Sequence, residues 1–453
     1  MKNFEYVMSG LSLTRAINGL DSSPLFPHFV DIACELTENT VSRLESNNKH
    51  TTSIISGLYN AFVENRYGEK LRARRRMSLA NIYADSGGLQ IITAGKTITP
   101  ELKKKVYETQ TLADFGFCFD TIPLERVTPV RTKSERSNTS NKLFRVENLV
   151  TSATQTGKDI VEQLEYFENS GSTTKGFIIV QGNTPQDMLT WFSTIIEMVP
   201  ENLKNRIQGI ALADTCMGNG TLETVDMLIA AKKIADAYGT RYTQHIHLLG
   251  VGAINRMLPV ILLMKSGYLD FINHVSYDST THTDSLIKGR YFHGSRFNDI
   301  PPYRAQQSVE FFDRLYTRYE NIFSRYFTLD KYKDDVIFYT DTEARLKNKD
   351  FDKATWNTST IINLEDPQKF SADQHSFIKI IPYAGVLYQV EQFMMELDRV
   401  YGKKVNRGDP VSDLIFVEND SDMKKWIDTC SQNCNSSRIA RSDSIVNLTD
   451  FLE

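Results

Sequence analysis

The alternation of short apolar runs with amphipathic stretches over residues 75–295 constrains the fold of this chain more than any other feature of its sequence. The apolar runs have the length of strands, and the stretches between them carry apolar residues at helical spacing. This order is typical of parallel strands joined by crossover helices, and it indicates either a (β/α)8 barrel or a doubly wound sheet. The apolar runs are 81–87, 115–120, 176–182, 207–214, 245–252 and 271–278, and the helical stretches are 101–113, 159–170, 184–199, 223–239 and 254–267.

Each apolar run ends in a polar or glycine-containing step. In a barrel, and equally in a doubly wound sheet, the active site is built at the carboxyl ends of the parallel strands. The pattern therefore predicts where the site lies, and on its own it leaves both architectures open. The steps are DSGG at 85–88, FD at 119–120, QG at 181–182, AD at 213–214, GVG at 250–252 and YDS at 277–279.

Two regions depart from this alternation. Residues 127–145 are polar and basic, and they are predicted to form a long inserted loop. Beyond about residue 300 the alternation fades, although the stretches 308–327 and 375–402 have helical character. We therefore predict a barrel domain over 1–330, followed by an appended, mainly helical region over 331–453.

Composition places the chain among globular proteins, because 41% of its residues are hydrophobic and 11% are aromatic. The longest apolar runs, such as 258–264, are far shorter than the roughly 20 residues that span a bilayer. The N-terminus lacks the pattern of a signal peptide, and the five cysteines show no framework spacing. We therefore expect a reduced, cytoplasmic protein without membrane contact. With a net charge of −4, any nucleic acid must be bound by local basic patches.

The order of motifs along the predicted barrel is distinctive. These motifs are ADSGGLQ at 84–90, TPELKKKVYETQ at 99–110, ADFGFCFD at 113–120, VQG at 180–182 and LLGVG at 248–252. In this order they resemble the guanine transglycosylases, which carry DSGG(F/Y)Q, a PE…Q helix, an FDE strand and a Gly-Val-Gly strand. The resemblance covers roughly residues 75–295. It implies a TIM barrel with insertions, and an enzyme that exchanges guanine for a 7-deazaguanine in a polynucleotide without breaking the backbone.

The resemblance also implies a covalent exchange carried out by two carboxylates, as in retaining glycoside chemistry. It assigns Asp278 as the nucleophile that attacks the anomeric carbon and Asp85 as the general acid and base. A second register, counted from Asp270, puts Asn273 at the nucleophile position, where an amide could not act. Asp278 is preferred because Tyr-Asp-Ser matches the family's triplet of an aromatic residue, an aspartate and a small residue.

The base pocket follows from the same resemblance. Asp120 would pair with the N1–H and the exocyclic amine of a guanine-like ring, and Gln181 and Gly182 would read the base carbonyl. Leu249 would pack on the face of the base, and Gly250 would belong to the cradle around the ligand. The remaining substrate-binding residues directly follow the general acid and are Ser86, Gly87 and Gly88.

The chain departs from the tRNA-acting members of this family. Their zinc site would need four ligands, whereas the matching region offers only Cys430 and Cys434, with no histidine after them. Leu89 stands where those enzymes have a base-stacking aromatic residue. These departures favour the zinc-lacking, DNA-modifying DpdA-type enzymes of phages and bacteria, with DNA and a free base such as 7-cyano-7-deazaguanine as substrates. A tRNA-guanine transglycosylase without zinc and a non-catalytic, nucleic-acid-binding partner subunit are the alternatives.

Phosphate contacts are predicted for a basic cluster just before the first catalytic strand. Its members are Lys70, Arg72, Arg74, Arg75 and Arg76. His245 and His247 lie on one face of a predicted strand and could in principle bind a metal, but without a third ligand they are predicted to be satisfied core or pocket histidines. His274 and His282 flank Asp278 in the sequence and are candidates for tuning it. No metal or other cofactor is expected.

Overall fold

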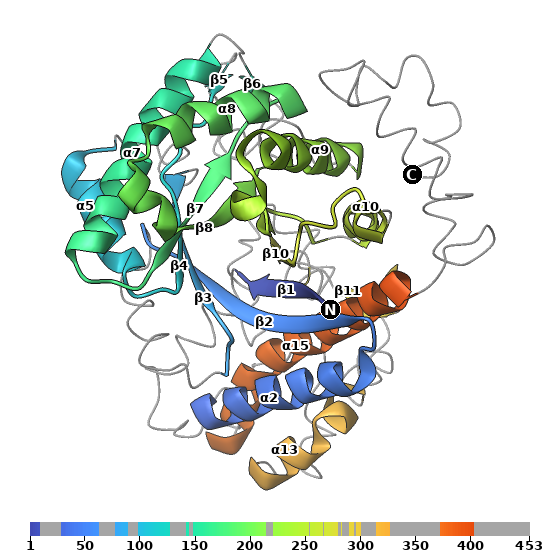
Figure 1. The fold of residues 1–453 in the computed structure, drawn as a ribbon. Coiled ribbons are helices and arrows are strands. Elements are labelled where there is room, and N and C mark those ends of the chain that lie inside the picture. The colour runs from blue at the N-terminus through green and yellow to red at the C-terminus, as the bar shows by residue number, and fades with distance from the viewer. Residues whose placement is uncertain are drawn as a thin grey trace.

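Parallel strands close into a barrel in the computed structural model of the chain (Figure 1). The structure describes residues 1–9, 29–62, 78–88, 98–126, 142–144, 148–213, 221–252, 254–265, 267–279, 282, 290–293, 296–299, 314–326 and 372–402. The barrel strands are β1 (Lys2–Met8), β2 (Thr51–Asn60), β3 (Ile82–Asp85), β4 (Phe115–Phe117), β7 (Lys175–Val180), β8 (Ile207–Leu212), β9 (His245–Leu248) and β10 (His274–Ser279).

Closure of the barrel comes from β1, which pairs in parallel with β2 on one side and with β10 on the other. The order around the barrel is β1, β10, β9, β8, β7, β4, β3 and β2. This confirms the predicted TIM barrel and excludes the alternative of a doubly wound sheet, in which two edge strands would stay unpaired on one side. All the barrel pairs are parallel, so every strand ends at the same rim.

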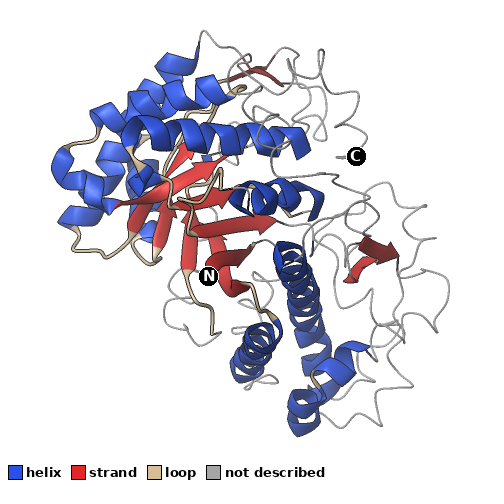
Figure 2. Cartoon of the chain, turned by 45° about the vertical axis from the view of Figure 1, so that its right-hand side comes forward, coloured by secondary structure: helices blue, strands red, loops and turns tan. Residues whose placement is uncertain are grey.

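Helices cover the outside of the barrel (Figures 1 and 2). They are α2 (Phe29–Asn47), α5 (Pro100–Gln110), α7 (Leu149–Asn169), α8 (Pro185–Met198), α9 (Thr221–Tyr238), α10 (Ile254–Lys265) and α15 (Ala372–Gly402), with short 3-10 turns η4 (Glu201–Arg206) and η5 (Thr240–Tyr242). A further helix, α13 (Glu320–Tyr326), packs against α2. No described helix is long and apolar enough to cross a membrane.

Two of these helices begin with the same local signal. Thr99 and Thr184 are the N-caps of α5 and α8, and a proline follows each of them at the first helical position. The Thr99 hydroxyl accepts the amide of Leu102 at 3.2 Å, and the Thr184 hydroxyl accepts the amide of Asp187 at 3.1 Å. A capping hydroxyl followed by proline satisfies one free amide and removes another, which fixes where each helix starts.

The region between β4 and α7 contains a two-stranded antiparallel ribbon, formed by β5 (Leu124–Arg126) and β6 (Lys142–Phe144). This ribbon brackets residues 127–141, which lie outside the described residues, so most of the predicted inserted loop is not described. A second ribbon, β11 (Arg290–His293) and β12 (Arg296–Asp299), follows the barrel.

Helix α15 packs on the barrel between α2 and α10, although the sequence places it far beyond the last strand (Figure 1). The hydroxyls of Thr37 and Tyr383 lie 2.8 Å apart where α2 meets α15. Asp398 accepts the backbone amides of His50 at 2.9 Å and Thr51 at 2.7 Å, and so holds the turn that leads into β2. A domain boundary at residue 330 would separate α15 from the barrel elements that it contacts.

The inward face of the barrel is unusually polar. Apolar side chains fill the layer between strands and helices, where Trp191 is fully buried and donates its indole N–H to the carbonyl of Ile179 at 2.9 Å. In contrast, Glu5, His247 and Ser276 are fully buried inside the barrel. TIM barrels usually fill this space with branched apolar residues, so a polar interior calls for a network of hydrogen bonds.

Candidate active site

The predicted site residues gather at the carboxyl rim of the barrel. Asp85 is the last residue of β3, Asp278 is the penultimate residue of β10, and Asp120 follows β4. Gln181 follows β7, and Gly250 follows β9. The charge of Asp278 helps to raise the pKa of Asp85, and the charge of Asp85 helps to raise the pKa of Asp120, so Asp85 lies within electrostatic reach of both other carboxylates. Residues scattered over the sequence thus form one acidic centre.

Asp85 is a carboxyl group poised between its two protonation states. Burial, with a further contribution from the charge of Asp278, raises its pKa from 3.8 to about 6, although the backbone amides of Gly87 and Ser86 oppose the shift. The side-chain amide of Asn60 donates to Asp85 Oδ2 at 3.3 Å. The residue keeps part of its surface exposed, so a group with a pKa close to neutral is open to a ligand.

Asp278 is held by one of its two oxygens. His247 Nε2 lies 3.2 Å from Oδ1, and the backbone amide of Gly250 donates to the same oxygen at 3.1 Å. Among the described residues, no group forms a hydrogen bond with Oδ2. The side chain is 16% exposed. One oxygen is therefore fixed by the protein, and the other makes no hydrogen bond with a described residue.

The competing position, Asn273, lies at the other end of the same strand. It directly precedes β10, and its backbone amide donates to the carbonyl of Gln244 at 2.9 Å. Five residues of a strand separate it from Asp278, a distance of about 16 Å at the usual rise. Asn273 therefore lies at the amino-terminal end of the barrel, away from Asp85 and Asp120.

Asp120 and Gln181 form a buried pair beside Asp85. The side-chain amide of Gln181 donates to Asp120 Oδ2 at 2.7 Å, and both side chains are buried. Burial raises the pKa of Asp120 from 3.8 to about 7; the bond from Gln181 opposes this shift and the charge of Asp85 adds to it. A Cβ on Gly88 would lie 3.2 Å from Asp120 Oδ1, so the glycine lets the loop pass close to this carboxyl.

The other glycines have separate structural reasons. Gly87 has a φ of +76°, and a Cβ there would lie 2.6 Å from Cβ of Phe62. Gly250 has a φ of +73°, which turns the chain so that its amide reaches the nucleophile candidate. A Cβ on Gly182 would lie 2.7 Å from the amide of Met188, so packing of α8 alone already requires glycine there.

Leu249 and Ser86 lie beside these groups. Leu249 is partly buried against the core, and its amide donates to the carbonyl of Leu212 at 3.1 Å. Ser86 is buried, and its hydroxyl accepts the amide of Gly88 at 3.4 Å. Their backbones help to shape the rim, and their predicted contacts with a base stay predictions.

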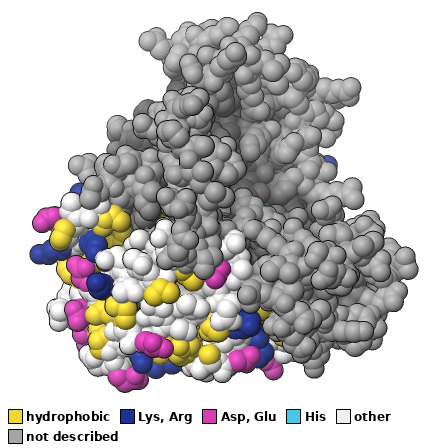
Figure 3. All heavy atoms as spheres, turned by 90° about the horizontal axis from the view of Figure 1, so that it is seen from above, with side chains coloured by type: hydrophobic (Ala, Val, Ile, Leu, Met, Phe, Trp, Pro, Cys, Tyr) yellow, Lys and Arg dark blue, Asp and Glu magenta, His cyan; other side chains and the backbone are white. Residues whose placement is uncertain are grey.

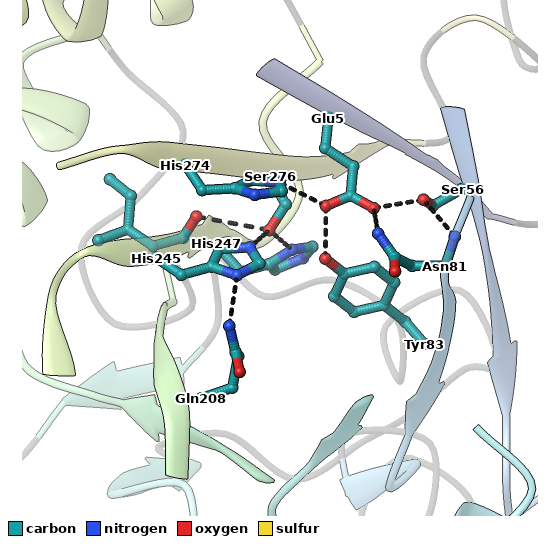
Figure 4. Close-up of polar contacts among 10 residues, drawn as sticks. Glu5, Ser56, Asn81, Tyr83, Gln208, His245, His247, His274 and Ser276 are labelled. Atoms are coloured by element: carbon teal, nitrogen blue, oxygen red, sulfur yellow. Dashed lines mark hydrogen bonds and ion pairs between the residues drawn. The ribbon is translucent and has the colours of Figure 1, made fainter. Parts of the chain in front are cut away.

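A buried cluster of polar groups lies deeper in the barrel (Figure 4). Glu5 accepts hydrogen bonds from His274 at 2.6 Å, Tyr83 at 2.7 Å and Asn81 at 2.8 Å, and also from Ser56. Burial acts to raise the pKa of Glu5, but the bond and the positive charge of His274, with the hydroxyls, outweigh it and lower the pKa to about 2. Glu5 is therefore an ionised, fully paired carboxylate.

His247 is the residue that sequence reasoning missed. The sequence predicts a satisfied core or pocket histidine at this position without naming its partner, and the structure places its Nε2 beside Asp278. The expected tuning residues lie elsewhere: the His274 side chain bonds Glu5, and the His282 ring packs 5.0 Å from the ring of Phe393. The two-residue spacing showed that His245 and His247 share a face, but it could not show which strand they meet.

The only group of possible metal ligands among the described residues is Glu5, His245 and His274, whose ligand atoms lie within 4.8 Å of one another. The rings of His245 and His274 are stacked, with centroids 3.9 Å apart and an angle of 19° between their planes. Lone pairs in two nearly parallel planes do not converge on one ion at the roughly 2.1 Å that zinc requires. The geometry of this cluster suits hydrogen bonding better than metal binding.

The predicted nucleic-acid contacts fall outside the described residues. This applies to the basic cluster at 70–76, to most of the inserted loop, and to Cys430 and Cys434. On the face shown in Figure 3, the described surface carries basic and acidic side chains interspersed, without one continuous basic patch. Phosphate binding at 70–76 stays a prediction.

No protein-family model matches this sequence, and no curated protein matches it at a significant level. The chemistry of the site must therefore be inferred from its own residues and from the motifs that they form.

Proposed function

We propose that this chain is a DNA-guanine transglycosylase, which exchanges guanine in DNA for a free 7-deazaguanine such as 7-cyano-7-deazaguanine. The observation that carries the proposal is the pair of unlike carboxylates at the barrel rim. Asp278 is held through one oxygen by His247 and the backbone amide of Gly250, whereas burial raises the pKa of nearby Asp85 to about 6. Two carboxyl groups in such unlike surroundings suit the roles of a nucleophile and an acid–base partner.

The first half of the exchange forms a covalent intermediate. Asp278 Oδ2 attacks C1′ of the target nucleotide, and the bond between C1′ and N9 breaks. The electron pair of that bond leaves with guanine, which takes up the proton held by Asp85. An acid with a pKa of about 6 holds this proton in a useful fraction of molecules at neutral pH.

The second half reverses these steps with a different base. Asp85, now ionised, takes the N9 proton of the incoming 7-deazaguanine, and N9 attacks C1′. The bond between C1′ and Asp278 breaks, its electron pair returns to the carboxylate, and the modified nucleotide is released. Protons and charges balance over the cycle, so no redox partner or metal is needed.

Asp120 and Gln181 would select the base. In the absence of ligand Asp120 is buried with a pKa of about 7, and its main donor is Gln181. The N1–H and exocyclic amine of a guanine-like base would supply two further donors to the carboxylate, which favour its ionised form. This predicts tighter binding of the base above neutral pH than below it, as the carboxylate becomes available.

The choice of DNA rests on the sequence, namely the absence of a recognisable zinc motif and the presence of Leu89 in place of an aromatic residue. In a duplex the target nucleotide must first leave the stack, which costs a few kcal/mol. The non-catalytic alternative is disfavoured, because Asp85, Asp120 and Asp278 are all present and lie together at the rim.

The test is incorporation of a radiolabelled 7-deazaguanine into duplex DNA and, in parallel, into tRNA. We expect label in DNA, a covalent adduct trapped with denaturant, and loss of both in Asp278→Ala. Asn273→Ala is the matched control, because it changes the same strand at its far end and should leave exchange within about threefold. Label only in tRNA would refute the choice of polymer. Exchange that survives Asp278→Ala would refute the mechanism.

A further inference from the structure

A continuous chain of hydrogen bonds runs through the barrel interior from Gln208 to His247 (Figure 4), and from His247 it continues to Asp278. The Gln208 side-chain amide lies 3.5 Å from His245 Nδ1, and His245 Nε2 lies 3.0 Å from the hydroxyl of Ser276. That hydroxyl lies 2.9 Å from His247 Nδ1, and His247 Nε2 lies 3.2 Å from Asp278 Oδ1. Four neighbouring pairs thus connect β8 to the nucleophile candidate across β9 and β10.

The direction of each bond follows from counting protons, beginning at His245. Burial and the neighbouring His274 hold the pKa of His245 well below its usual range, so its ring is neutral and carries one N–H. Its Nδ1 faces the donor amide of Gln208 and therefore acts as acceptor. The proton of His245 must then be on Nε2, from which it is donated to the hydroxyl of Ser276.

The Ser276 hydroxyl accepts the proton of His245, and it has a single proton of its own to donate. The acceptors near it include His247 Nδ1 at 2.9 Å, the carbonyl of Ile246 at 3.4 Å and the phenol oxygen of Tyr83, which already donates its own proton to Glu5. The shorter contact takes the proton, which makes His247 Nδ1 an acceptor. The N–H of His247 is then on Nε2 and points at Asp278 Oδ1.

We propose that His247 is a positioning residue, whose ring presents an Nε2–H to Asp278 Oδ1 because the chain through Ser276 and His245 fixes the position of its proton. This role rests on the proposed function of Asp278 as nucleophile. Together with the amide of Gly250, the ring holds Oδ1 still and leaves Oδ2 facing the substrate.

The surroundings of His247 are consistent with a ring held in one orientation. The side chain is fully buried, and the rings of Phe117 and Tyr83 pack against it with centroids at 4.7 and 5.7 Å. The charged or titratable groups that face it are Asp278, Asp85, His245 and the phenol of Tyr83. A buried imidazole between a hydroxyl and a carboxylate has both nitrogens bonded, so its ring cannot flip without losing both bonds.

The test is the protonation state of His247 in the full chain, read by nitrogen-15 NMR of labelled histidine and assigned by loss of its signal in His247→Gln. We expect a proton on Nε2 and a bare Nδ1 at about pH 8. Ser276→Ala should shift the population toward the other tautomer. A proton on Nδ1, or on both nitrogens, would overturn the proposal.

A matched pair of variants tests the positioning role of His247 in the exchange reaction. His247→Gln keeps an N–H at about the same reach, whereas His247→Leu has similar bulk and no donor. We expect the first to stay within about tenfold of the wild-type exchange rate, and the second to lose about a hundredfold in kcat with little change in KM. Equal losses in both variants would overturn the positioning role. If the wild type shows no exchange, the proposed function fails, while the NMR result still decides the tautomer.

Discussion

Replacing Asp120 with asparagine should stabilise the protein, and the gain should grow as the pH rises. In the folded state burial raises the pKa of this carboxyl to about 7, whereas 3.8 is expected in an unfolded chain. The folded protein therefore binds more protons than the unfolded chain between these two values. The free energy of unfolding must fall as the pH rises through this range, and it reaches its lower plateau above about pH 7.

The size of the effect follows from the shift. A difference of about three pKa units corresponds to about 4 kcal/mol lost at high pH, since one unit is worth about 1.4 kcal/mol. Between about pH 5 and about pH 8.5 the free energy of unfolding should fall by about 3 kcal/mol, because part of the loss has already occurred at pH 5. Asparagine is nearly isosteric, can still accept the bond from Gln181, and does not ionise.

Thermal unfolding of both proteins at the two pH values measures this effect. The midpoint of Asp120→Asn should exceed that of the wild type, and the gap should widen by on the order of 5 °C between about pH 5 and about pH 8.5. The variant should at the same time lose selectivity for guanine-like bases. A gap that stays constant, or narrows as the pH rises, would refute the assignment of a raised pKa to this carboxyl.

Two further changes probe the other carboxyl groups. Asp85→Asn should lower the exchange rate by about 10²- to 10⁴-fold and remove the limb near pH 6 from the pH–rate profile, measured with labelled base; retention of that limb would assign it to another group. Glu5→Gln should destabilise the protein by about 3 kcal/mol near neutral pH in urea unfolding, because the pKa of Glu5 is lowered to about 2 from 4.5. This lowered pKa stabilises the fold above about pH 4.5, so the deficit should shrink as the pH falls toward 3; a deficit that grows on acidification would contradict it.

The barrel was predictable from the sequence because most of its strands are continuous apolar runs. β1 and β2 do not show this pattern, because their inward positions carry polar side chains such as Glu5 and Ser56, which interrupt the apolar run. Their partners are then set by closure of the barrel, a property of the whole sheet. The position of α15 could not be predicted either, because its own sequence does not indicate that it packs against α2 and α10.

The site was predictable to the extent that strand ends meet at one rim. Asp85, Asp120 and Asp278 each end or follow a strand, so parallel order alone brings them together. The partner of each carboxyl could not be predicted in this way. His247 reaches Asp278 because β9 and β10 pair with His247 opposite Ser276, and this register depends on how the whole barrel closes.

The carboxyl groups inside this barrel divide by depth into two kinds. Glu5 lies in the interior with a partner for each oxygen, and its lowered pKa means that its ionised form stabilises the fold. Asp85 and Asp120 lie at the rim, where burial exceeds the pairing available and their raised pKa values make ionisation unfavourable. A substrate that donates protons or hydrogen bonds at the rim would relieve this unfavourable ionisation. Under the proposed function, this unfavourable ionisation would become binding energy for a base with the right donors, and the interior network would hold the proposed nucleophile in place during the exchange.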